Sequence, residues 1–208
     1  HIMRKIERAL AIGCHPDDIE VGCAGTIATW TKSDIEFYLM VMTLGESGGD
    51  AVTRKQEQEN SAAILGIKKL YWGDYIDTKL PLDNTLITDI ERVINEIEPD
   101  VVFVHYHKDS HQDHRILSTA TITASRYTAN LLFYEGPSTY EFSPTVFVDI
   151  SNNIIKKFDS LHAHASQVNK TNISGLNIKE IAEANAIFRG VEGRVKYAEA
   201  FMPFRFFI

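Results

Sequence analysis

Cysteine is scarce in this 208-residue chain, and the two cysteines, Cys14 and Cys23, lie nine positions apart. That spacing does not match a zinc finger. Both cysteines have apolar neighbours, so we expect them to be small buried side chains. Their sparse use is consistent with a reducing, cytoplasmic setting.

Long runs of basic residues and long runs of apolar residues are also missing. The net charge is −7 and no basic run occurs, which argues against a nucleic-acid or anionic-lipid partner. No apolar stretch is long enough to span a bilayer, and no secretory signal opens the sequence. Residues 1–3, His-Ile-Met, resemble a cloning remnant ahead of the natural start. We therefore expect a cytoplasmic protein without a membrane or nucleic-acid partner.

The first half of the chain alternates between strand-like and helix-like segments. Strands are predicted at residues 9–14, 36–43, 69–72 and 101–104, with helices after residue 19, at 53–65 and at 86–97. This order indicates an α/β fold with a doubly wound, mostly parallel, Rossmann-like sheet and helices on both faces. No G-x-G-x-x-G follows the first strand, which disfavours a dinucleotide enzyme.

The second half is less regular, but it contains no linker, so we expect a single domain over residues 4–208. Its predicted helices cover residues 114–128, 154–168 and 178–188, and its predicted strands cover residues 131–134, 145–150 and 197–201. The chain closes on an apolar tail with four phenylalanines between positions 201 and 207. Such a tail packs on the core or between subunits, and we expect a homo-oligomer contact.

A polar tetrapeptide, His-Pro-Asp-Asp at residues 15–18, follows the first predicted strand. His15 and Asp18 are three positions apart and can bind one metal ion, whereas Pro16 cannot continue the strand. Asp17 can then stand beside the metal as a base. The alternative is a simple turn, because Asp and Pro are turn residues.

A second polar cluster, residues 105–115, follows the strand at residues 101–104. Ligands of such sheets bind beyond the carboxyl ends of the strands, so both clusters are expected at one edge. His114, in the first turn of a helix, would complete a site with His15 and Asp18. Two histidines and a carboxylate suit hydrolytic Zn²⁺, and they also suit non-haem Fe²⁺. His105 and His107 are expected to be strand-end residues rather than ligands.

Several motifs along nearly the whole chain point to one family. They are His15-Pro16-Asp17-Asp18 with Gly22, Gly25 and Thr26; Arg54, Glu57 and Leu65-Gly66; His111-Gln112-Asp113-His114; His164-Ala165-Ser166-Gln167; and Tyr197-Ala198-Glu199-Ala200-Phe201. In these features the chain resembles the LmbE-like, or PIG-L, family of zinc-dependent N-acetylglucosamine deacetylases. The paired His-Pro-Asp-Asp and His-x-Asp-His motifs are the specific part of the match.

The resemblance implies a role for each matching residue. His15, Asp18 and His114 would bind zinc, and Asp17 would be the general base. His111 would assist at the carbonyl oxygen with Asp113 oriented behind it. Arg54 would lie near the sugar. The resemblance also implies a small N-acetylated sugar as the substrate and a tendency to form oligomers.

The expected reaction is hydrolysis of an acetamide, giving acetate and a free amine. His111 would need a pKa raised by a carboxylate to act protonated, and Asp113 is the candidate. Glu46 and Ser47, on a glycine-rich loop, are candidate sugar contacts.

Two alternatives stay open: a zinc amidohydrolase acting on another small amide or a sugar nucleotide, and a zinc- or sugar-binding protein without turnover. The sequence leaves open the group attached to the sugar, the metal used in the cell and the number of subunits. It also leaves open whether Asp17 or His111 protonates the leaving amine.

Overall fold

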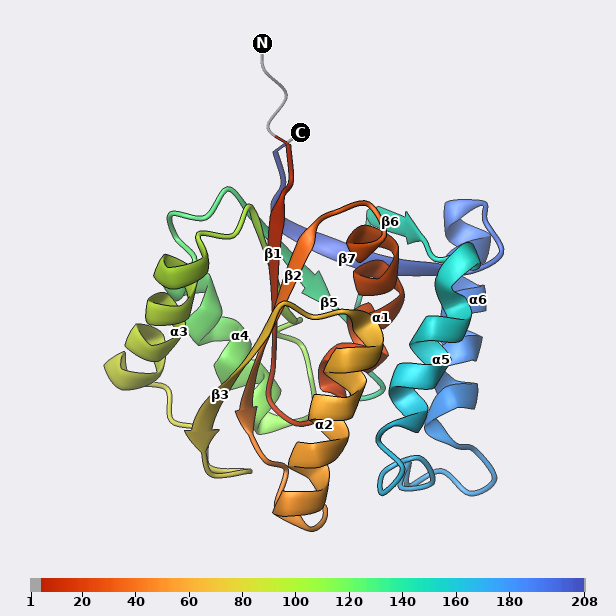
Figure 1. The fold of residues 1–208 in the computed structure, drawn as a ribbon, viewed down its shortest axis with the longest axis horizontal. Coiled ribbons are helices and arrows are strands. Elements are labelled where there is room, and N and C mark those ends of the chain that lie inside the picture. Colours follow the sequence, from red (N-terminus) through yellow and green to blue (C-terminus); the bar gives the residue numbers. More distant parts are fainter. Residues whose placement is uncertain (1–4, 208) are drawn as a thin grey trace.

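A seven-stranded sheet forms the centre of the protein, with the strand order β3-β2-β1-β4-β5-β7-β6 (Figure 1). The computed structural model describes residues 5–207, so the expected cloning remnant at residues 1–3 lies outside the described part. The first five strands pair in parallel: β1 (Arg8–Gly13), β2 (Glu36–Thr43), β3 (Lys69–Tyr75), β4 (Val101–His105) and β5 (Asn130–Tyr134). The mostly parallel, doubly wound sheet predicted from the sequence is confirmed.

The last two strands make the far edge of the sheet antiparallel. They are β6 (Val146–Asp149) and β7 (Ala198–Arg205), and β7 pairs with both β5 and β6. Phe201 is fully buried against Phe103 of β4, at 5.1 Å between ring centroids. Phe204 and Phe207 are exposed. The apolar tail is therefore divided between the core and the surface.

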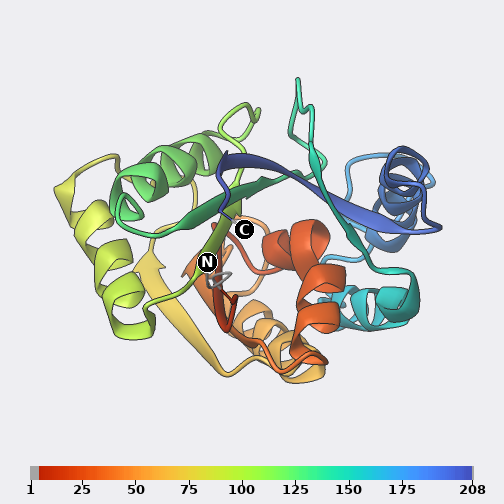
Figure 2. The same ribbon diagram turned by 90° about the horizontal axis from the view of Figure 1, so that it is seen from above.

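Helices cover both faces of the sheet, as Figures 1 and 2 show. One face carries α3 (Asn84–Ile97) and α4 (Gln112–Ala124); the other carries α1 (Asp18–Thr31), α2 (Ala51–Leu65), α5 (Ile154–His162) and α6 (Ile178–Gly193). The single turn η1 (Ser151–Asn153) leads into α5. Within residues 5–207 no helix is both long enough and apolar enough to cross a bilayer.

Two cores form because successive strand residues point to opposite faces. Leu10 and Ile12 of β1 pack with the α3 and α4 side, whereas Ala9 and Ala11 pack with the α1 and α2 side. Every residue of β4 is buried, as expected for a parallel strand that is covered on both faces.

Helix ends follow local chemistry. Asp50 caps α2 by accepting from the Thr53 N–H at 2.8 Å, and Gly66 ends it with a φ of 72°. Asp83 caps α3, because its carboxylate accepts from the Leu86 N–H.

The sheet order places the functional loops side by side. The chain leaves β1 toward β2 on one side, whereas β4 pairs with β1 on the other side. The loops after β1 and β4 therefore meet at the switch point, where α/β sheets bind ligands.

Candidate active site

The loop after β1 carries a strained residue, Asp17. Its φ is 98° and its ψ is −25°, in the left-handed region that costs a non-glycine residue roughly 1–3 kcal/mol. The turn is held by the Asp18 N–H, which donates to the His15 carbonyl at 3.2 Å, and by the Asp17 N–H, which donates to Gln58 at 3.3 Å. This geometry turns Asp17 and Asp18 in different directions at the start of α1.

His15, Asp18 and His114 converge on one point. His15 Nδ1 lies 3.1 Å from Asp18 Oδ2, His114 Nε2 lies 3.3 Å from that oxygen, and the two nitrogens are 3.4 Å apart. Donors about 2.0–2.1 Å from a tetrahedral Zn²⁺ are separated by about 3.3 Å. The three donor atoms therefore fit a metal of this size without rearrangement.

Carboxylates stand behind both histidines. His15 Nε2 lies 2.9 Å from Asp77 Oδ1, and His114 Nδ1 lies 3.1 Å from Asp109 Oδ2. Such partners hold the proton on the outer nitrogen and leave the inner nitrogen's lone pair for a metal. With a metal bound, these carboxylates would favour the tautomer in which the inner nitrogen of each ring is the ligand.

The site is strongly negative, and its histidines respond to that charge. Burial lowers the pKa of His15, but the three carboxylates around it outweigh burial and raise the pKa to about 12. Burial also opposes protonation of His114, whose pKa is raised to about 9, chiefly by Asp18 and then by Asp109. An environment that favours positive charge on its ligands also favours a divalent cation, for which those protons would compete.

Asp17 stands beside this triangle and belongs to none of the groups of three donors within the described residues. Burial, and then the neighbouring Asp18 carboxylate, raises the pKa of Asp17 to about 6. Arg54 Nη2 lies 3.6 Å from Asp17 Oδ2. A carboxylate with a pKa near neutrality suits a general base.

Arg54 lines the catalytic opening, and both of its terminal nitrogens donate to the protein. Its Nη1 donates to the Gly45 carbonyl at 2.6 Å and its Nη2 donates to the Pro16 carbonyl at 2.8 Å. A Cβ on Gly45 would lie 2.0 Å from Arg54 Nη1, so this position requires glycine. Arg54 thus joins the loop after β2 to the loop after β1.

Glu46 and Ser47 support Asp77. The Asp77 N–H donates to Glu46 Oε1 at 2.8 Å, and the Ser47 N–H donates to Asp77 Oδ2 at 3.0 Å. Ser47 lines the opening beside His15. The Glu46 carboxylate is used for positioning Asp77 rather than being free for a sugar.

His111 lies over the triangle as the N-cap of α4, with its ring centroid 4.7 Å from that of His15. Its Nδ1 accepts from the Asp113 N–H at 3.2 Å. Burial, and then charge on His114 and His15, lowers the pKa of His111. The expected increase of its pKa is therefore wrong.

Asp113 is not placed behind His111 as expected. Its carboxylate accepts from the Thr78 N–H at 2.8 Å and the Leu80 N–H at 3.3 Å. Its Oδ2 lies 3.5 Å from His15 Nε2, so Asp113 contacts the ring of His15 rather than that of His111. The reason is that α4 starts at Gln112, which turns the Asp113 side chain toward the loop after β3.

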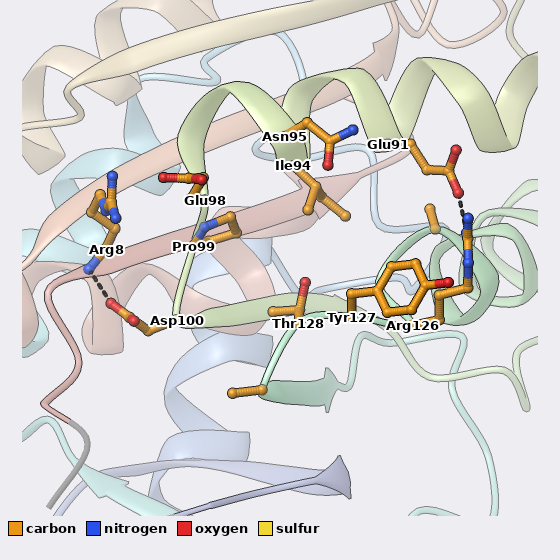
Figure 3. A pocket seen from close by; sticks show the side chains of 12 residues that line it. Arg8, Glu91, Ile94, Asn95, Glu98, Pro99, Asp100, Arg126, Tyr127 and Thr128 are labelled. Atoms are coloured by element: carbon orange, nitrogen blue, oxygen red, sulfur yellow. Dashed lines mark hydrogen bonds and ion pairs between the residues drawn. The ribbon is translucent and has the colours of Figure 1, made fainter. Parts of the chain in front are cut away.

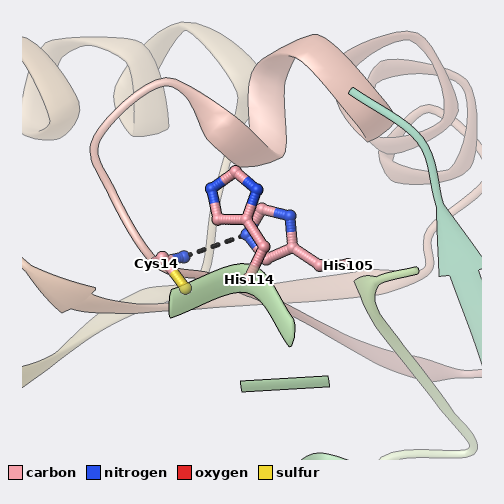
Figure 4. A group of neighbouring side chains, drawn as sticks. All are labelled: Cys14, His105 and His114. Carbon is pink, nitrogen blue, oxygen red and sulfur yellow. Dashed lines mark hydrogen bonds between the residues drawn. The ribbon is translucent and has the colours of Figure 1, made fainter. Parts of the chain in front are cut away.

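His105 is closer to the site than the sequence suggested. Its ring stacks on that of His114 at 3.8 Å, and its Nε2 accepts from the Cys14 N–H at 3.2 Å (Figure 4). Cys14, His105 and His114 form a second group of three potential donors. Burial, and then Asp18, raises the pKa of Cys14 well above its usual range, so its thiol is a poor ligand.

The two outer carboxylates, Asp77 and Asp109, were not identified from the sequence. Asp77 lies in a long segment between β3 and α3 that carries no motif. Asp109 is in the second cluster, two residues before His111, and that closeness was its one available signal.

His164, expected to be a structural histidine rather than a fourth ligand, is buried with Nε2 3.1 Å from Glu20 Oε1. It belongs to none of the three-donor groups within residues 5–207.

Cavities flank the triangle on two sides. One, of about 340 Å³, is lined by residues that include His15, Asp17, Arg54 and His111. The other, of about 210 Å³, touches Asp18 and His114 and extends toward α6. A larger cavity, about 760 Å³, lies at the other edge of the sheet. Arg8 and Asp100, at the amino ends of β1 and β4, are among the residues that line it (Figure 3).

Comparison with known proteins agrees with this geometry. The sequence profile of the family "PIG-L: GlcNAc-PI de-N-acetylase" matches residues 10–125. The uncharacterized deacetylase YaiS of Escherichia coli (strain K12) is 37% identical in an alignment of 166 positions that covers 76% of this chain and 90% of that protein. The diacetylchitobiose deacetylase of Thermococcus kodakarensis is 30% identical, over 78% of this chain and 70% of that protein.

A solved structure extends the match to the whole fold. The N,N'-diacetylchitobiose deacetylase of Pyrococcus horikoshii superposes with a TM-score of 0.85 at 26% identity, over 96% of this chain and 84% of that chain. The profile match covers the loops that carry both halves of the donor triangle. The chain belongs to the GlcNAc-PI de-N-acetylase (PIG-L) family of hydrolytic N-deacetylases.

Proposed function

We propose that the protein is a zinc-dependent hydrolase that removes the N-acetyl group from an N-acetylglucosamine-type sugar. The observation that carries the proposal is the donor triangle of His15, Asp18 and His114 with the unligated Asp17 beside it. A binding protein has no use for a buried base with a pKa near 6 next to its metal ligands.

The proposed metal site uses His15 Nδ1, Asp18 Oδ2 and His114 Nε2. When bound there, Zn²⁺ would act as a Lewis acid and lower the pKa of water. Asp17 would accept the proton of the attacking water. The same donors suit Fe²⁺, and metal-exchange experiments distinguish Fe²⁺ from Zn²⁺.

His111 can hold the developing oxyanion as a neutral donor. Because its Nδ1 accepts from the Asp113 N–H, the neutral ring carries its proton on Nε2. That N–H is available to stabilise negative charge on the carbonyl oxygen. Since its pKa is lowered, His111 is a poor proton store, and we assign return of the proton to the leaving amine to Asp17.

The substrate proposal rests on the relatives and on the opening. Two relatives have names that state a substrate, and both are diacetylchitobiose deacetylases, which act on an N-acetylated sugar. Ser47, Thr78 and Gln167 line the opening and supply neutral hydrogen-bonding groups for sugar hydroxyls.

We also propose a cytoplasmic homo-oligomer. Cys14 and Cys23 are free and buried, which suits a reducing compartment. Phe204 and Phe207 expose 48% and 67% of their surface on the tail, which suits a subunit contact. Light scattering on the purified protein measures the subunit number, and a monomer at all concentrations would contradict this contact.

The test of the function is release of primary amine from a panel of N-acetylglucosamine derivatives by zinc-loaded protein. We expect release by the wild type and by Asp159→Asn, an exposed control on α5, and almost none by Asp17→Asn. Zinc binding without release from any derivative would favour the sugar-binding alternative or an untested amide.

A further inference from the structure

The cavity on the Asp18 and His114 side of the metal triangle has a partly apolar wall. It measures about 210 Å³, and its lining includes Asp17, Asp18 and His114 themselves, so it opens directly on the reacting groups. Apolar side chains from α1, β5, the loop after β5 and α6 also line it: Val21, Tyr134, Pro137, Ile178 and Ile181.

The cavity on the other side of the triangle has the opposite character. Apart from Gly48, every residue that lines it has a polar side chain. Asp17 and Asp18 line both cavities, so the proposed base and one proposed ligand lie between the two spaces. An amide that is cleaved at this point therefore has a polar space on one side and a partly apolar space on the other.

The partly apolar cavity is larger than an acetyl group requires. A cavity of about 150 Å³ is enough to hold a benzene molecule, whereas the acyl part of an acetamide ends in a single methyl group. A neighbouring cavity of about 260 Å³ shares Val21, Gly136, Pro137 and Ile181 with it, which extends the space along α6. An acetyl group would leave most of this volume unfilled.

Gly136 lines both of these cavities and borders open space. A Cβ on Gly136 would have no heavy atom of the described residues within 4 Å, apart from its neighbours along the chain. Its φ lies outside the left-handed region, so a side chain can be introduced there without backbone strain. Gly136 is thus a position at which the free volume can be reduced by substitution.

The polar groups of this cavity do not favour an anionic or a sugar ligand. Lys170 is its one lysine, and Lys170 Nζ donates to the Gly48 carbonyl at 2.8 Å. His105 Nε2 accepts from the Cys14 N–H. Because these groups are bound to the protein, a neutral apolar chain fits the wall better than a second polar ring.

We propose that this cavity binds the acyl group of the substrate and accepts straight acyl chains of about four to six carbons as well as acetyl. The inference rests on the proposed deacetylase function and broadens it to N-deacylation of amino sugars. In the reaction the water oxygen bonds to the carbonyl carbon and the C–N bond breaks, which gives a carboxylate and a protonated amine. Gly136 and Ile181 would set the length of the accepted chain.

The kinetic test uses the N-acetyl, N-propionyl, N-butyryl and N-hexanoyl derivatives of glucosamine with zinc-loaded protein. Because burial of a methylene group favours binding, kcat/KM should rise by about fourfold for each methylene from acetyl to butyryl. A kcat/KM that is constant or decreases with chain length would overturn the proposal.

Variants of the cavity wall locate the effect. Gly136→Leu fills the open space, so it should abolish the rise with chain length and leave hydrolysis of the N-acetyl derivative unchanged. Gly136→Ala adds one carbon and should retain most of the rise. Ile181→Ala enlarges the cavity and should extend the rise to hexanoyl. Ile187→Ala, at an exposed position of α6, is the matched control and should change nothing.

Three other results are informative. An equal loss for all four derivatives in folded, zinc-loaded Gly136→Leu would overturn the acyl assignment. A preference for N-succinyl over N-butyryl glucosamine that Lys170→Gln abolishes would overturn the apolar class. If no derivative is hydrolysed, the deacetylase proposal fails separately, and calorimetric titration with acetate and hexanoate decides the cavity. Tighter binding of hexanoate than of acetate by the wild type, but not by Gly136→Leu, supports the acyl site, and equal binding overturns it.

Discussion

Two buried polar clusters lie along α1, one at its start and one near its middle, and they differ in how completely their groups are paired. The Glu199 cluster consists of Glu199, Lys157, Gly25 and Thr26. Glu199 Oε1 accepts from Lys157 Nζ at 2.6 Å and from the Gly25 N–H at 2.8 Å; its Oε2 accepts from the Thr26 N–H at 2.6 Å. Lys157 Nζ also donates to the Val21 carbonyl at 2.7 Å.

The catalytic cluster of His15, Asp18 and His114 is arranged differently. The outer ring nitrogens, His15 Nε2 and His114 Nδ1, face carboxylates. The inner atoms, His15 Nδ1, His114 Nε2 and Asp18 Oδ2, face one another. Both inner nitrogens need a lone pair directed inward to act as ligands. The comparison teaches that burial and charge alone do not mark a site. A saturated cluster stabilises the fold, whereas convergent acceptors indicate a site that can bind a cation.

The largest expected effect is removal of a metal ligand. His114→Ala deletes one of three donors, so zinc affinity should fall by more than the roughly 10–100-fold that loss of an outer partner causes. Zinc per chain after dialysis measures this. His162→Ala, an exposed histidine on α5, is the control and should keep its zinc. Full zinc in His114→Ala would mean that another residue, such as His105, is the third ligand.

Loss of the proposed general base, Asp17, should have the next largest effect. Asp17→Asn should lower kcat for amide hydrolysis by roughly 10²–10⁴-fold, the usual contribution of a general base. Because Asp17 is outside the triangle, the zinc content of the variant should stay at the wild-type value. A kcat within a few-fold of the wild type would remove the assignment.

Removal of a carboxylate behind a histidine should have a smaller effect on zinc affinity. Asp109→Asn removes the charge 3.1 Å from His114 Nδ1, and zinc affinity should fall by roughly 10–100-fold. Competition with a chelator of known affinity gives the value. Wild-type affinity in Asp109→Asn would show that this contact does not orient the ligand.

The smallest expected effect on the active site comes from a substitution in the Glu199 cluster. Glu199→Gln leaves Lys157 buried without its charge partner, so the free energy of unfolding should fall by about 3–5 kcal/mol. Urea denaturation measures this. Zinc affinity and kcat of the folded variant should match the wild type, and a large loss of either would contradict the division into two kinds of cluster.

The sheet could be predicted from the sequence because its signals are local. Apolar runs such as Val101–Val104 and the helix stop at Gly66 depend on neighbours in the chain. The proposed inner ligands were accessible for a related reason. His15 and Asp18 follow β1 directly, and His114 lies in the first turn of α4, the helix after β4. A parallel sheet aligns the ends of these two strands.

The positions of Asp77 and Asp113 beside His15 could not be predicted, because they depend on the paths of long loops. Asp77 reaches His15 through an irregular segment whose path is set by Glu46 and Ser47. The misplacement of Asp113 has the same origin: backbone N–H groups of Thr78 and Leu80 compete for its carboxylate. Such contacts between segments thirty or more residues apart leave no pattern in the sequence.

Adjacent aspartates provide the most direct test of the central claim, that Asp18 is a ligand and Asp17 is not. Zinc content and affinity should be measured for Asp17→Asn and Asp18→Asn side by side. The account predicts one zinc per chain in Asp17→Asn and a loss of zinc in Asp18→Asn. Retention of zinc by Asp18→Asn, or its loss from Asp17→Asn, would contradict the account.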